Sequence, residues 1–105
     1  MSQRAKTAEE YAGLVDQVIF ELEEFAATMN ADVEAIDVNM TFLEMLLAEV
    51  RKLRTEMADG SYLFGRNDLP FMRLVKKGDE KTLPFIRLFY RINETHRQGL
   101  DVPAD

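Results

Sequence analysis

Apolar residues recur every three or four positions along the first third of the chain. This stripe consists of Ala8, Tyr11, Val15, Val18, Leu22, Phe25 and Met29. Such spacing is typical of one face of an α-helix. Thr7 and Glu10 stand at its start with the spacing of a capping box, in which the Thr7 hydroxyl accepts a hydrogen bond from the Glu10 amide. Further apolar residues widen one flank, so we expect this helix to pack against several neighbours rather than in a narrow two-stranded coiled coil.

The same rhythm resumes after residue 32 and predicts a second long helix. Its stripe consists of Val33, Ile36, Met40, Leu43, Leu47 and Val50 and continues through Arg54 to Met57, before Gly60. A short connection makes two such helices antiparallel neighbours, so residues 8–58 are expected to form a long helical hairpin. Reversal of the chain near residue 30 would place Glu9 and Glu10 beside Arg51 and Lys52, and Arg54 beyond the end of the first helix.

A hexapeptide of the C-terminal half occurs twice. Leu69-Pro70-Phe71-Met72-Arg73-Leu74 returns as Leu83-Pro84-Phe85-Ile86-Arg87-Leu88. Asp68 and Thr82 precede the two copies as N-cap residues, and proline suits the first turn of a helix. After a connector at residues 59–67 we therefore expect two helices within residues 68–99, a short one ending near Gly78 and a longer one ending near Gly99. Residues 100–105 are expected to form a flexible tail.

The whole chain, residues 1–105, is therefore predicted to be a single all-α domain with a four-helix, bundle-like architecture. Several large apolar residues lie outside the predicted seam of the hairpin or on the strongly apolar last helix. They are Phe20, Phe42, Met45, Phe85, Phe89 and Tyr90. A helix that is apolar over most of its circumference is normally buried. Because a domain of this size has little material to cover it, we expect these six residues to form an interface, with a homodimer as the simplest solution.

Charge is unevenly distributed along the chain, whose net charge is −6. Residues 1–50 carry 2 basic and 11 acidic side chains, whereas residues 51–105 carry 11 basic and 8 acidic ones. Arg73, Lys77, Arg87 and Arg91 form a basic cluster on the last two helices. Pairing with the acidic hairpin, in the same chain or in a second copy, is the favoured explanation. The alternative is that the basic helices 69–77 and 83–98 contact a nucleic acid or another anion, although the domain as a whole is acidic.

Residues that could carry chemistry are few. The chain has no cysteine and one histidine, His96, so neither a zinc site nor a di-iron site is expected. Gly60 and Gly65 have the spacing of a phosphate loop, but Arg66 and Asn67 replace the required lysine and hydroxyl residue. We expect no catalytic, metal or cofactor site, and His96 is interpreted as a surface residue of a last helical turn. A small enzyme holding an anion through arginines ranks last, because no acid or base accompanies them.

The composition favours a cytoplasmic protein. The chain lacks cysteine, an early apolar run typical of a signal peptide, and any apolar stretch near the roughly 20 residues that cross a bilayer. The predicted function is that of a small helical protein–protein interaction module, an adaptor or regulator, acting as a homodimer on a protein partner that the sequence does not identify. The alternative function is a regulator that binds nucleic acid.

Overall fold

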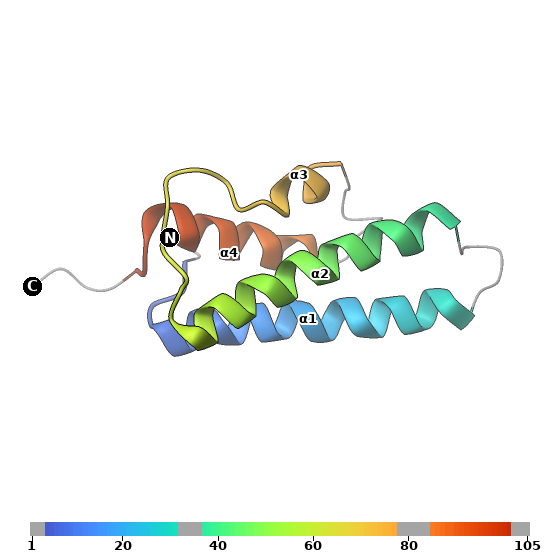
Figure 1. Cartoon of the computed structure of the whole chain (residues 1–105), viewed down its shortest axis with the longest axis horizontal. Helices are drawn as coiled ribbons and strands as arrows, with labels where there is room; N and C mark the ends of the chain where they lie inside the picture. The colour runs from blue at the N-terminus through green and yellow to red at the C-terminus, as the bar shows by residue number, and fades with distance from the viewer. Residues whose placement is uncertain (1–3, 32–36, 78–84, 102–105) are drawn as a thin grey trace, which may run out of the picture.

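The predicted all-α class is confirmed by the computed structural model, which describes residues 4–31, 37–77 and 85–101, with side chains at 4–27, 42–77 and 85–101. This part of the chain forms four helices and no strand: α1 (Ala8–Ala31), α2 (Asp37–Asp59), α3 (Met72–Val75) and α4 (Ile86–Gln98). Helix α1 packs against both α2 and α4, and the short α3 also packs against α2 and α4 (Figure 1). No helix in the described part is both long and apolar enough to span a bilayer.

Helix α1 begins as the sequence predicts. The Glu10 N–H donates to the Thr7 hydroxyl at 3.0 Å, which is the Thr7 half of the capping box. The apolar stripe then supplies much of the core, with Tyr11, Val15, Val18 and Leu22 buried. The helix is therefore held by the side chains whose spacing predicted it.

Helices α1 and α2 lie side by side and run in opposite directions (Figure 1). The predicted register between them is wrong. Arg51 lies 3.8 Å from Glu23, not beside the first turn of α1, and Arg54 lies 2.8 Å from Asp16. Helix α1 runs through the expected reversal point to Ala31, and Arg54 faces α1 instead of lying beyond its end.

The buried face of α2 is also rotated from the predicted seam. Leu43, Leu46, Val50 and Leu53 are buried, whereas Leu47 is only partly buried. Helix α2 meets α3 as well as α1, so it is packed on more than the side that faces α1. Gly60, with φ of +82°, follows the end of α2, as predicted for a helix stop.

Helix α3 is shorter than predicted, a single turn over Met72–Val75. Leu69 and Phe71 precede it in a turn, in which the Met72 N–H donates to the Leu69 carbonyl at 2.9 Å. The expected Asp68 cap does not form, since no side chain caps the start of α3. The second repeat begins at residues 82–84, which lie outside the described residues, as does Gly78.

Helix α4 buries one face rather than most of its circumference. Its buried residues are Ile86, Phe89, Ile92, Asn93 and Thr95. The Phe89 side chain is completely buried, with its ring 5.3 Å from the Phe71 ring. One chain therefore covers the apolar face of α4 with α1, α3 and the connector, which corrects the expectation that a second chain is needed for this helix.

The segment before α1 and the segment after α4 meet at the end of α4. The Ala5 N–H donates to the Thr95 hydroxyl at 3.0 Å, and the Asp101 N–H donates to the Ala5 carbonyl at 2.8 Å. Leu100, at the start of the predicted flexible tail, packs against the core. Gly99, with φ of +84°, ends α4 as predicted.

Candidate functional site

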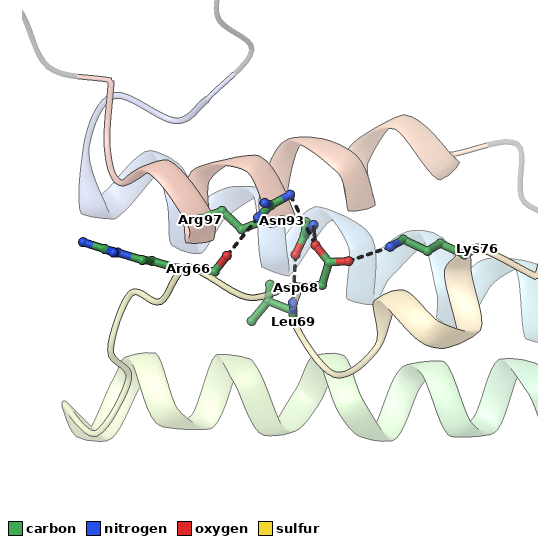
Figure 2. A network of polar contacts seen from close by, with 6 residues as sticks. All are labelled: Arg66, Asp68, Leu69, Lys76, Asn93 and Arg97. Carbon is green, nitrogen blue, oxygen red and sulfur yellow. Dashed lines mark hydrogen bonds and ion pairs between the residues drawn. The ribbon is translucent and has the colours of Figure 1, made fainter.

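The segment between α2 and α3, residues 60–71, is longer than the predicted connector and is called the connector from here on. A network around Asp68 holds it against α4 (Figure 2). The Asp68 carboxylate accepts hydrogen bonds from Lys76 Nζ at 2.6 Å and from Asn93 Nδ2 at 3.0 Å, and Arg97 Nη1 lies 3.6 Å away. The Lys76 and Asn93 hydrogen bonds lower the pKa of Asp68. Asn93 is buried, and its Oδ1 accepts from the Leu69 N–H at 2.8 Å. Asp68 is thus an anchor of the connector rather than a helix cap.

The connector also follows the last turn of α4. The Gly65 N–H donates to the His96 carbonyl at 3.3 Å, and Arg97 Nε donates to the Arg66 carbonyl at 3.1 Å. A Cβ atom at Gly65 would lie 3.2 Å from His96 Nε2. The glycine therefore permits the close approach of the backbone to the histidine ring.

Three side chains from distant parts of the chain form a hydrogen-bonded series. The Tyr11 hydroxyl on α1 donates to the Ile92 carbonyl at 3.3 Å and lies 2.7 Å from the Tyr62 hydroxyl. The Tyr62 hydroxyl in turn lies 2.7 Å from His96 Nδ1. The series joins α1, the connector and α4, so the surface interpretation of His96 is wrong: this side chain fixes the position of Tyr62.

The environment keeps all three groups of this series uncharged near neutral pH. Burial raises the pKa of Tyr11, and its hydrogen bond with Tyr62 raises it further. Burial also raises the pKa of Tyr62, and its hydrogen bond with Tyr11 partly offsets this rise. Burial lowers the pKa of His96, opposed by the Asp68 carboxylate. The protonated, charged imidazole is therefore disfavoured relative to a histidine in water.

Tyr62 and His96 line a cavity of about 250 Å³, which we call the connector cavity. It lies where the connector passes between α2 and α4. Its apolar lining comes from Leu53, Leu63, Leu69, Pro70 and Phe71. Glu49, Lys52 and Glu56 of α2 supply its charged lining. The arrangement combines an apolar interior, one neutral hydrogen-bonded pair and a charged rim, which is the composition of a binding site.

A second hollow of about 200 Å³ shares Tyr62 with the connector cavity. It is mostly apolar and includes Tyr11, Met57 and Phe64, with Arg54 as its charged residue. The Phe64 ring stacks on the Tyr11 ring at a centroid distance of 5.8 Å. Tyr62 therefore stands between two hollows, and both are bordered by the apolar part of the connector.

The predicted interface residues are distributed between the surface and the core. Phe20, Met45 and Tyr90 are 56%, 45% and 45% exposed, on α1, α2 and α4 respectively. Phe42 and Phe85 are partly buried against the core. Phe89 is in the core and offers no surface, so the interface prediction now depends on the three exposed side chains. Two further large apolar side chains that were not predicted as interface residues are also exposed, Leu63 at 80% and Phe64 at 48%.

The predicted basic cluster is carried by α3 and α4 and the turn after α3. Arg73, Lys77 and Arg87 are exposed, and Arg91 is partly buried. Their pairing with the acidic hairpin stays a prediction. Of the acidic residues on α1, Glu23 lies beside Arg51 of α2.

The geometry of the described residues offers no metal site and no phosphate loop. Nowhere in residues 4–27, 42–77 and 85–101 do three histidine, aspartate or glutamate side chains come together as metal ligands. The first helix after Gly65 begins only at Met72. A phosphate at Gly65 would therefore not meet a helix N-terminus, which the phosphate-loop chemistry requires.

Asn93, Tyr62 and His96 were not predicted as positioning residues. Asn93 had a usable signal, because it stands at helical spacing from Ile86 and Phe89 and so lies on the apolar face of α4. A polar residue on such a face normally needs a buried partner. Tyr62 and His96 had none, since their contact spans 34 positions of the chain.

Comparisons with protein-family models, with curated proteins and with solved structures gave no match to this chain.

Proposed function

We propose that this chain is a small helical protein–protein interaction module, an adaptor or regulator, that acts as a homodimer. The observation that carries the proposal is the exposure of five large apolar side chains on a chain whose core is otherwise well formed. They are Phe20, Met45, Leu63, Phe64 and Tyr90. Exposed apolar side chains of this size are the residues that a contact site buries. The lack of cysteine suits the reducing cytoplasm, where we place the protein.

The proposed dimer uses the helical surface rather than the connector. Phe20 and Met45 lie on the two long helices, which we take to form a hairpin, and Tyr90 lies on α4. Aromatic residues and methionine are enriched at interfaces. A two-fold arrangement would bring each such residue into the interface twice, because both copies contribute the same surface. The connector, with Leu63 and Phe64, is then left for another partner.

Sedimentation equilibrium of surface variants tests this assignment. Met45→Ser and Tyr90→Ser are expected to shift the population toward the monomer, because each removes apolar area from the proposed interface. Leu63→Ser is the matched control, since it removes an even more exposed apolar side chain from the connector. It is expected to leave the mass unchanged. Equal masses for all three variants and the parent would contradict the assignment.

The competing proposal is a nucleic-acid regulator that uses the basic residues of the C-terminal half. The exposure of Arg73, Lys77 and Arg87 supports it. It predicts affinity for duplex DNA that falls steeply with salt and weakens in the variant Arg87→Gln/Arg91→Gln. Binding that shows neither dependence would exclude this proposal.

A further inference from the structure

We propose that the connector cavity receives one apolar side chain of a partner protein, and that a basic residue next to that side chain meets Glu49 and Glu56. This inference rests on the proposed function and deepens it, because it names the docking site and the chemistry of the partner. None of Phe20, Met45 and Tyr90, the proposed dimer surface, lines the connector cavity.

The size of the cavity suits a side chain. Its volume is about 250 Å³, whereas an engineered cavity of roughly 150 Å³ already holds benzene. Pockets for whole drug-sized ligands run from roughly 300 to 1,000 Å³. A phenylalanine or leucine side chain fits the space, and Leu53, Leu69 and Phe71 provide apolar contacts for it.

The lining of the cavity is already held in place. The Leu69 N–H is bound to buried Asn93 at 2.8 Å, and the Tyr62 hydroxyl lies 2.7 Å from His96 Nδ1. Leu53 and Phe71 are buried in the core. A partner that enters the cavity therefore has little of this surface to order, which favours binding.

The negative charge beside the cavity favours a partner with a basic residue next to the docked apolar side chain. Lys52 lies three residues after Glu49 and four before Glu56, so all three side chains project from one side of α2. One ammonium group cannot neutralise two carboxylates. Within the described part of the chain, neither carboxylate has an ion-pair partner at 4.0 Å or less. Burial lowers the pKa of His96, which disfavours a compensating positive charge on the histidine.

The surroundings of the cavity favour a chain segment over a free small molecule. Leu63, at 80% exposure, lines the cavity and continues its apolar surface outward. The second hollow, of about 200 Å³, lies on Tyr62 as well and adds the exposed Phe64 ring. An extended peptide could place neighbouring side chains in both hollows, whereas a single small ligand would fill one.

Nuclear magnetic resonance of the labelled full chain tests the proposal with three synthetic peptides. They are acetylated, amidated tripeptides of sequence Arg-Phe-Arg, Arg-Ala-Arg and Glu-Phe-Glu. The first is expected to shift the amide signals of Leu53, Tyr62, Leu69 and His96. Loss of the aromatic anchor or reversal of the flanking charge is expected to weaken binding about fivefold or more. Equal shifts with all three peptides, or no shifts at the cavity with the first, would overturn the proposal.

Two charge variants distinguish the effect of the carboxylates that line the cavity, Glu49 and Glu56, from the effect of the net charge of the protein. Glu49→Gln/Glu56→Gln is expected to reduce affinity for Arg-Phe-Arg about fivefold and to flatten its dependence on salt. Glu9→Gln/Glu44→Gln makes the same charge change at exposed positions outside the cavity and is expected to bind like the parent. Equal weakening in both variants would overturn the rim assignment.

Failure of this inference differs visibly from failure of the proposed function. If the protein is a dimer and none of the three peptides binds, only the proposal that the connector cavity docks a partner is refuted. If the protein is a monomer and Arg-Phe-Arg binds in the cavity, the docking proposal is supported and the homodimer is refuted.

Discussion

Truncation of Phe89 tests whether its side chain belongs to the core of one chain, as in the structure, or to an interface between two chains, as the sequence suggested. Its side chain is completely buried and its ring lies 5.3 Å from Phe71 and 6.0 Å from Phe85. Phe89→Ala removes this burial and leaves a cavity, which lowers the free energy of unfolding by about 3–5 kcal/mol. Small domains are stable by only about 5–15 kcal/mol, so the variant is expected to be close to unfolding. Tyr90 is one residue later in the chain but 45% exposed. Tyr90→Ala is therefore expected to change the free energy of unfolding by no more than about 1 kcal/mol.

Urea unfolding followed by circular dichroism at two protein concentrations measures these differences. Phe89→Leu is the control that keeps most of the apolar volume, and its loss is expected to stay below about 1.5 kcal/mol. The difference in the free energy of unfolding between Phe89→Ala and the parent is expected to be the same at both protein concentrations, because the contacts of Phe89 lie within one chain. A Phe89→Ala loss of less than about 1 kcal/mol, or one no larger than that of Tyr90→Ala, would refute the placement of Phe89 in the monomer core.

Further predictions concern the contacts that shape the candidate site. Asn93→Leu removes the buried acceptor of the Leu69 N–H and is expected to lower the free energy of unfolding by about 1–3 kcal/mol; hydrogen exchange at the Leu69 amide is expected to accelerate, and unchanged exchange would contradict the role of Asn93. Gly65→Ala would bring a Cβ to 3.2 Å from His96 Nε2, so we expect a shift of the His96 ring signals, whereas an unchanged spectrum would contradict the close approach. Because the pKa of His96 is lowered in the folded chain, the unfolded chain binds more protons below about pH 6.5; stability is expected to decrease as pH falls through that range, and less so in His96→Gln, as measured by urea unfolding at several pH values.

The long helices were predictable because apolar residues recur at helical spacing and because Gly60 and Gly99 stop the helices that precede them. Their mutual register was not. Asp32, Asp37 and Asn39 are all N-cap residue types, so the sequence did not determine where the second helix begins. The pairing of Arg54 with Asp16 of α1, which runs to Ala31, shows that the expected register was wrong.

The C-terminal half was harder because side chains there form contacts over long sequence distances. Asp68 was expected to cap a helix, but its carboxylate instead accepts a hydrogen bond from Asn93, 25 positions away. Local capping rules do not contain that competing partner. The burial of Phe89 likewise depends on α1, α3 and the connector, whose packing could not be inferred from the apolar pattern of α4 alone.

The solution mass of the parent protein tests the proposed homodimer most directly. Light scattering after size exclusion, at low and at high salt, is expected to give twice the chain mass of 12.1 kDa in both conditions. Apolar contacts survive salt, whereas contacts between exposed charges are screened. A mass of 12.1 kDa in both conditions would contradict the homodimer.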